Sequence, residues 1–260
     1  MPHCRSTAAL TRVQAAPNYS GHVLGISDRD PAFRDDDGSA DAGVTEAFAA
    51  FAAGQGSEQA VLTPLAGSRL LVPIVAVLAG EAERGPGVLA GEKAADMAMP
   101  TLIGLDGRRA IPAFTSQDSM RAWQRAARPV PVQALRAWQA ATADSCAVVI
   151  DVAGPVPLAV EGARLAALAR GEDAPAPCAD PDVREAVSAV LAGQLAVAGF
   201  ELRPGGPEYD LMIALTLSAD GTGPDAGGLA AWIGNAVMER LGGRFRRGIA
   251  ILLDAAGAPA

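Results

Sequence analysis

The chain has 260 residues and a mass of 26.3 kDa, enough for one large domain or two small ones. Folding at this mass buries about 70% of the surface that the unfolded chain exposes. The 50% hydrophobic content supplies a core of Ala, Val, Leu and Ile, because only 4% of the residues are aromatic. A net charge of −8 and a pI near 4.8 argue against whole-chain attraction to nucleic acid or to anionic lipid.

Cysteine content and hydropathy predict a reduced, cytoplasmic protein. The three cysteines, Cys4, Cys146 and Cys178, are too few and too scattered for a disulfide framework or a zinc site. No basic, apolar and small-residue pattern opens the sequence, so a secretory signal is not expected. The longest apolar run, 70–80, has eleven residues and contains a proline, whereas a membrane helix needs about 20 residues.

Residues 1–43 show no sustained apolar period and end in the acidic stretch 35–41. Such a segment cannot bury enough apolar surface to offset the entropy lost on ordering, so we expect a mobile acidic tail over 1–43. From Val44 onwards the pattern becomes helical. Thr45 is expected to cap a first short helix, and a second helix follows Ser57.

Strand-like apolar runs then follow at 69–78, 97–105, 109–114, 146–152 and 156–160. Between the third and fourth runs the period becomes helical, and a helix is expected to begin after Thr115, with Asp118 completing a capping box. The spacing of apolar and basic residues predicts that this helix continues through Arg128. Pro131 is expected in the first turn of the next helix.

The Ala- and Pro-rich stretch 172–181 is expected to be a linker between two units. Residues 44–171 before it predict an α+β domain with a mixed sheet and flanking helices. Residues 182–260 after it show a helix, two strands, a helix and a strand, which is typical of a small α+β lobe. The predicted fold class is therefore α+β in both units.

The sequence offers no recognisable catalytic or cofactor-binding motif. Its two histidines, His3 and His22, both lie in the expected tail, so neither a serine triad nor a histidine-containing metal site is predicted. An EF-hand register that starts at Asp35 places Ala40 where the loop requires glycine. The glycine clusters at 87–94 and 221–227 miss the spacing of a phosphate or dinucleotide loop. We expect no catalytic residue, no metal and no cofactor.

Five individually unusual segments follow one another along the chain. They are RLLVPIVAVL (69–78), EKAADMAMPTL (92–102), RRAIPAFTSQDSMRAW (108–123), ARPVPV (127–132) and VVIDVAGPVPLAV (148–160). Together with the acidic DDDGSAD stretch (35–41), they resemble the SseB protein family, and more specifically its actinobacterial members with an SseB N-terminal domain. The resemblance covers 35–171 in detail and the C-terminal lobe loosely.

The resemblance implies a bacterial α+β domain with no established catalytic residues. The family name refers to an enhanced-serine-sensitivity phenotype, and a type III secretion label is also attached to the family. A chain without a membrane span or a coiled coil does not look like a secretion translocator.

We therefore expect a non-catalytic protein-interaction or regulatory protein, with an unknown protein or small ligand as partner. The alternative is a small-ligand sensor linked to amino-acid metabolism, and an enzyme of unrecognised type is a third reading. A pocket with converging polar groups would favour the sensor, whereas an apolar patch rimmed with charge would favour the interaction module. The chain is expected to be a monomer or a weak homo-oligomer that binds neither nucleic acid nor membrane.

The expected binding residues are Lys93, Asp96, Thr115, Ser116 and Arg128, which lie in the family-like segments. They occupy strand ends, turns and a helix start, where side chains point outward. The helix start would also offer backbone N–H groups to an anion or a carboxylate. The structural alternative gives these side chains ordinary duties as a cap, an ion-pair partner and a solvated lysine.

Overall fold

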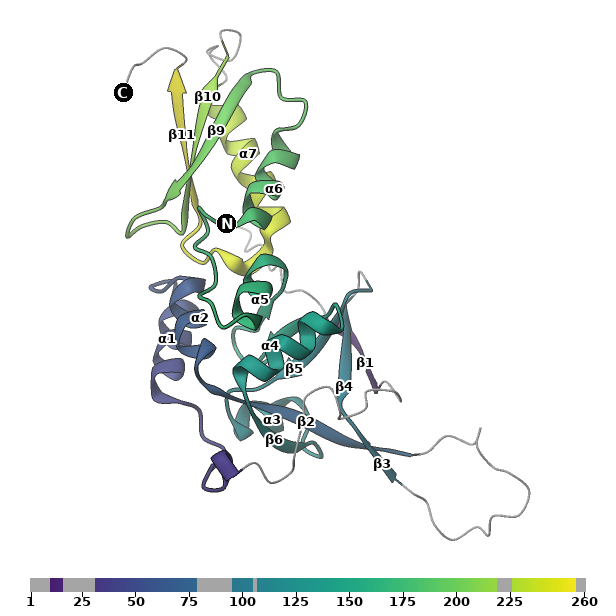
Figure 1. Cartoon of the computed structure of the whole chain (residues 1–260). Coiled ribbons are helices and arrows are strands. Elements are labelled where there is room, and N and C mark those ends of the chain that lie inside the picture. The colour runs from purple at the N-terminus through teal and green to yellow at the C-terminus, as the bar shows by residue number, and fades with distance from the viewer. Residues whose placement is uncertain (1–9, 16–30, 79–94, 105–106, 219–225, 256–260) are drawn as a thin grey trace, which may run out of the picture.

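A computed structural model describes residues 10–15, 31–78, 95–104, 107–218 and 226–255, and these ranges form two lobes joined end to end (Figure 1). The N-terminal lobe packs helices on two sheets. The C-terminal lobe lays two helices on a three-stranded sheet. The predicted α+β fold class is confirmed for both lobes.

The two sheets of the N-terminal lobe have the strand orders β1-β4-β5-β7-β8 and β3-β2-β6. Their strands are β1 (Leu10–Ala15), β2 (Arg69–Leu78), β3 (Ala95–Ala98), β4 (Pro100–Gly104), β5 (Arg109–Ala113), β6 (Arg128–Gln133), β7 (Ala147–Ile150) and β8 (Leu158–Val160). A single bridge between Leu71 and Phe114 joins β2 to the end of β5. The two sheets therefore meet near the start of β2.

Helices cover both faces of this lobe. Four of them share one large apolar core: α1 (Ala42–Ala52), α2 (Glu58–Ala66), α4 (Ala134–Ala143) and α5 (Gly162–Ala169). The helix α3 (Gln117–Trp123) packs on the opposite side. Side chains alternate along a strand, so Leu70 and Val72 of β2 enter the first core while Leu71 enters the second.

The C-terminal lobe has the predicted order of helix, two strands, helix and strand. Its elements are α6 (Pro181–Leu191), β9 (Val197–Pro204), β10 (Leu211–Leu217), α7 (Ala226–Leu241), a short 3-10 helix (Gly242–Arg244) and β11 (Ile249–Ala255). The central strand β10 pairs antiparallel with β9 and parallel with β11. Asp180 caps α6, and its carboxylate accepts a hydrogen bond of 2.9 Å from the backbone N–H of Asp182.

The mobile acidic tail over 1–43 stays a prediction, but parts of this segment form elements that the sequence did not predict. Residues 10–15 form β1, which pairs antiparallel with β4. Asp41 caps α1 in place of the predicted Thr45, accepting hydrogen bonds from Gly43 and Val44. The sequence carries no signal for β1, because a strand that pairs with a partner almost ninety residues away needs no apolar period of its own. Residues 1–9 and 16–30 lie outside the described ranges.

Two further element predictions need correction. The expected strand 97–105 is divided into β3 and β4, because β3 pairs with β2 whereas β4 pairs with β1 and β5. The expected helix from Thr115 to Arg128 ends at Trp123. Residues 128–133 form β6, where Pro129 faces Pro73 of β2 and Pro131 begins no helix. The prolines were misleading because they suit a strand edge as well as a first helical turn.

The predicted linker 172–181 is packed against the N-terminal lobe. Ala174 is buried, and its carbonyl accepts a hydrogen bond of 2.7 Å from the side chain of Gln59 in α2. The division into domains 44–171 and 182–260 stays a prediction. Among the described helices, none combines the length and the hydropathy that crossing a bilayer requires.

The buried Trp138 of α4 provides a test of this core. Truncation of a fully buried aromatic side chain leaves a cavity, so Trp138→Ala should lower the free energy of unfolding by about 3–5 kcal/mol in urea denaturation. Trp232 of α7 is 49% exposed and serves as the matched control, because its truncation removes little buried surface. Equal losses for the two variants would contradict the packing described here.

Candidate functional site

Three of the predicted site positions lie at or next to residues that pair with β2, at points three residues apart along that strand. Phe114, which precedes Thr115, exchanges backbone hydrogen bonds of 2.8 and 2.9 Å with Leu71. Further along β2, Ile74 pairs with Arg128 of β6 and Val77 pairs with Asp96 of β3. One strand thus gathers segments that are far apart in the sequence.

The predicted site residues nevertheless differ in how far their side chains are exposed to solvent. Arg128 is exposed, as expected, whereas Thr115 is buried and Ser116 is half-buried. For Asp96 the structure gives the strand position alone. Lys93 lies outside the described residues.

Thr115 is bound to Asp151, a residue that the sequence analysis did not single out. The Asp151 carboxylate accepts a hydrogen bond of 2.9 Å from the backbone N–H of Thr115 and one of 2.6 Å from its hydroxyl. The two residues follow β5 and β7, which are parallel neighbours, so they meet at the carboxyl ends of these strands. In open α/β sheets this is the edge where ligands bind. The available sequence signal was a carboxylate directly after a buried β-branched strand.

The backbone at Asp151 is unusual as well. Its φ of +48° lies in the left-handed region, which side-chain-bearing residues seldom adopt. The chain is held there by the bonds to Thr115 and by a hydrogen bond of 2.9 Å from the Asp151 N–H to the carbonyl of Ala113. Burial raises the pKa of the Asp151 carboxyl, and the hydrogen bonds from Thr115 and Ser119 offset part of that rise.

Ser116, not Thr115, caps α3. Its hydroxyl oxygen accepts a hydrogen bond of 3.1 Å from the backbone N–H of Ser119. The N–H of Gln117 donates to the carbonyl of Gly38 at 2.8 Å. Because these donors already have partners, the predicted anion site at the start of α3 is not supported.

Arg69, at the start of β2, ties the acidic stretch to this cluster. Its guanidinium donates to the carbonyl of Thr115 at 2.8 Å and to the carboxylate of Asp36 at 2.7 Å. A further bond of 2.6 Å reaches the carbonyl of Ser39. The polar groups of the cluster therefore bond to one another and join four segments of backbone. The cluster consists of Arg69, Asp36, Thr115 and Asp151.

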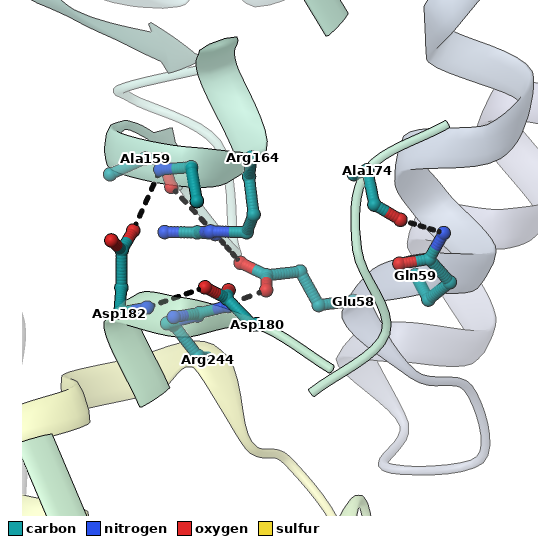
Figure 2. A network of polar contacts seen from close by, with 9 residues as sticks. Glu58, Gln59, Ala159, Arg164, Ala174, Asp180, Asp182 and Arg244 are labelled. Carbon is teal, nitrogen blue, oxygen red and sulfur yellow. Dashed lines mark hydrogen bonds and ion pairs between the residues drawn. The ribbon is translucent and has the colours of Figure 1, made fainter. Parts of the chain in front are cut away.

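A second polar cluster lies between the lobes and contains three buried charges and a fourth, Arg244, that is partly buried (Figure 2). Glu58 of α2, Arg164 of α5 and Asp180 before α6 are 4%, 3% and 1% exposed. Glu58 binds Arg164 through one carboxylate oxygen and Arg244 through the other, at 3.2 Å. Arg244 also binds Asp180 at 2.6 Å. Two carboxylates and two guanidiniums thus balance in charge; we call these four residues the interlobe network.

Electrostatics within the interlobe network follow from burial and pairing. Burial lowers the pKa of Arg164, and Glu58 compensates for only part of this effect. Burial acts in the same direction on Arg244, but the attraction of Glu58 and Asp180 outweighs it and raises the Arg244 pKa. Both carboxylates therefore stabilise the guanidinium charge of Arg244.

Gly162 permits a further close contact between the lobes. It begins α5 at a φ of +59°, and the N–H of Ala163 donates a hydrogen bond of 2.8 Å to the carboxylate of Asp182 in α6. A Cβ atom on Gly162 would lie 2.0 Å from that same carboxylate, so no residue with a side chain fits here without displacement. The guanidinium of Arg246 also lies 5.3 Å from the ring centre of Phe51 in α1.

A shallow depression of about 330 Å³ lies at the amino ends of β5 and β7, opposite the Thr115–Asp151 pair. Arg108, Arg109 and Glu161 border it, and Leu165 is among the apolar residues beneath. Arg108 pairs with Glu161 at 2.6 Å, and Arg109 donates to the carbonyl of Asp144 at 2.8 Å. Burial raises the pKa of the Cys146 thiol in its wall, which disfavours the nucleophilic thiolate. In the described ranges, no three His, Cys, Asp or Glu side chains are placed to hold a metal ion.

The α+β architecture of the N-terminal lobe and the segments gathered along β2 define the class of domain. Residues 44–167 match the family model of the SseB protein N-terminal domain. Residues 44–167 therefore form an SseB-type N-terminal domain, as the sequence segments indicated. No curated protein and no solved structure gives a significant match to this chain.

The interlobe network predicts a large cost for removing one arginine. Arg244→Ala leaves the carboxylates of Glu58 and Asp180 buried without this partner, so the free energy of unfolding should fall by about 3–5 kcal/mol. The control is Arg203→Ala, which breaks an exposed pair with Glu201 and should leave the unfolding curve unchanged. The network would contribute nothing if both variants unfolded at the urea midpoint of the wild type.

The Asp151 carboxyl predicts a pH dependence. Its pKa is raised on folding, so its contribution to stability is complete below the unfolded pKa, near 4, and is lost as the pH rises through the higher folded value. Asp151→Asn keeps the shape, tolerates the left-handed φ and cannot ionise. The free energy of unfolding of the wild type should therefore fall relative to the variant between about pH 4 and neutrality. A constant difference over this interval would show that the carboxyl titrates alike in both states.

Proposed function

We propose that the chain is a non-catalytic protein-interaction or regulatory protein that binds its partner through the open edge of β11. The observation that carries the proposal is the character of this edge strand. In the described part of the chain, β11 pairs with β10 on one side and with no strand on the other. A free strand edge offers a row of backbone donors and acceptors to an added strand.

The sequence of β11, IAILLDA, is apolar except for Asp254. It runs in register with β10 over all seven pairs without a bulge, so the edge is regular over its whole length. Leu252 is 41% exposed, and Ile249, Ile251 and Leu253 are only partly covered by the lobe's own core. An apolar, regular edge of this kind favours association.

The opposite edge of the same sheet has a different character. β9 carries the ion-paired Glu201 and Arg203, ends at Pro204, and has an irregular register opposite Leu217. Charges, proline and bulges are the features by which proteins protect strand edges against association. Because one sheet has a protected edge and an unprotected one, the open edge of β11 is a specific feature of the fold.

The polar clusters support a binding role rather than catalysis. The carboxylate of Asp151 is occupied by Thr115, and the carboxylates of Glu58 and Asp180 are occupied by arginines. These groups join segments of backbone. The interlobe network also holds the C-terminal lobe against the SseB domain, so the lobe that carries β11 has a fixed orientation.

The runner-up function is a small-ligand sensor, and the depression beside Arg108 and Arg109 favours it. Its volume of about 330 Å³ is near the lower end of the range for ligand sites. An anionic group would have to compete with Glu161 for Arg108. The sensor reading therefore predicts a ligand with a carboxylate or phosphate group and a small apolar part.

Affinity capture from native-cell lysate tests the interaction proposal with the full chain as bait. Leu252→Lys places a charge on the β11 edge and should reduce recovery of the partner at least tenfold. Ala198→Lys adds the same charge to an exposed position on β9 and should leave recovery unchanged. Arg128→Ala tests the surface that the sequence predicted, which we retain as a second contact region near Asp96.

The outcomes separate the two functions. Equal recovery by the wild type and Leu252→Lys would remove β11 as the binding surface. A rise in melting temperature with an anionic metabolite, lost in Arg109→Ala, would favour the sensor instead.

A further inference from the structure

We propose that the partner of the β11 edge is β11 of a second copy of this chain. Two copies would pair antiparallel about a twofold axis and merge their three-stranded sheets into one continuous sheet. This inference rests on the proposed function, since it names the partner for the same edge.

The register follows from the length of the strand. β11 runs from Ile249 to Ala255, so its midpoint is Leu252. An axis at Leu252 pairs all seven residues with their counterparts and leaves no overhang. It places Leu252 against Leu252 and Ile251 against Leu253 of the other copy.

Both faces of the joined sheet gain from this pairing. Ile249, Ile251 and Leu253 pack against the helix-covered core but stay partly exposed at the edge, so a neighbouring strand would complete their burial. On the outer face, Leu252 lies in a cross-strand row with Ala214, and Ala250 lies in a row with Met212. Ala214 and Ala250 are small, which leaves room on this face for the Leu252 side chains of both copies.

The charges permit the same register. The one charged residue of β11, Asp254, would face Ala250 of the second copy rather than another carboxylate. The row through Ala250 continues over Met212 to Arg203, so the nearest charge in that row is positive. At longer range the two copies repel each other because each carries a net charge of −8, and added salt should therefore strengthen the dimer.

The β11 strand matches a second, antiparallel copy of itself in length, apolar character and placement of charge. We therefore favour a second copy over an unrelated segment as the partner. The strand is apolar on both faces and regular over its length, and its single charge is off the axis. A foreign strand would need the same pattern without the benefit of symmetry. Figure 1 shows β11 at the margin of its sheet, away from the N-terminal lobe's strands.

Light scattering after gel filtration tests the proposal on the full chain. The wild type should show twice the monomer mass at micromolar concentration, with the dimer fraction rising as sodium chloride increases from 0.05 to about 0.5 M. Leu252→Lys should be a monomer under all these conditions, whereas Ala198→Lys should dimerise like the wild type. Circular dichroism confirms that each variant is folded.

Cysteine cross-linking tests the register in a Cys4→Ser and Cys178→Ser background. Leu252→Cys should form a disulfide-linked dimer on mild oxidation, because facing residues of antiparallel strands lie about 4.5–5.5 Å apart. Asp254→Cys alone should not, because its two copies would lie four residues, about 13 Å, apart along the pair. A mixture of Ala250→Cys and Asp254→Cys chains should cross-link again.

The results distinguish this inference from the function on which it rests. A wild-type monomer at every concentration and salt level, together with a foreign protein that Leu252→Lys no longer captures, overturns the dimer and leaves the interaction function standing. A monomer without any edge-dependent capture overturns both. A dimer that persists in Leu252→Lys shows that another surface forms it and also overturns the inference.

Discussion

The arrangement of the two lobes depends on how Glu58 is neutralised. This carboxylate is removed from water, and its two guanidinium partners come from opposite sides of the lobe boundary. Burying two ions costs solvation free energy, and their mutual attraction offsets this cost only when the geometry of the pair is good. The interlobe network therefore adds specificity more than net stability. It permits one orientation of the lobes, since any other leaves a buried charge without its partner.

The ion pairs of the interlobe network also constrain the segment between the lobes and the sheet of the C-terminal lobe. Residues 172–181 have the composition of a flexible linker, yet Asp180 within them caps α6 and binds Arg244 at the same time. One side chain thus starts a helix and closes the lobe boundary. The orientation of α6 and of the sheet beneath it is fixed by the same contacts, and so is the direction in which β11 faces.

Local signals predicted the elements that form within a short stretch of chain, and they failed where distant contacts decide. The full extent of β2 and the order of elements in the C-terminal lobe both followed from the sequence. β6 was missed because its prolines also suit a helix start, and β1 because its pattern is set by β4. Thr115 was predicted to cap α3, but Ser116 is the cap and Thr115 bonds to Asp151, which lies 36 residues away. Asp151 had one local signal, its position directly after a buried strand, whereas the interlobe network had none.

The span of the interlobe network has a consequence for synthesis of the protein. Glu58 and Arg244 are 186 residues apart, so at a translation rate of 5–20 residues per second the carboxylate is made on the order of 10–40 s before its second partner. Arg164 follows Glu58 by 106 residues, so for the last part of that interval the SseB domain has Arg164 but not the cation that completes the cluster. Glu58 therefore stays open to water on the surface of α2 until Arg244 has left the ribosome, and a product that ends before Arg244 leaves the charges of Glu58 and Asp180 without this partner.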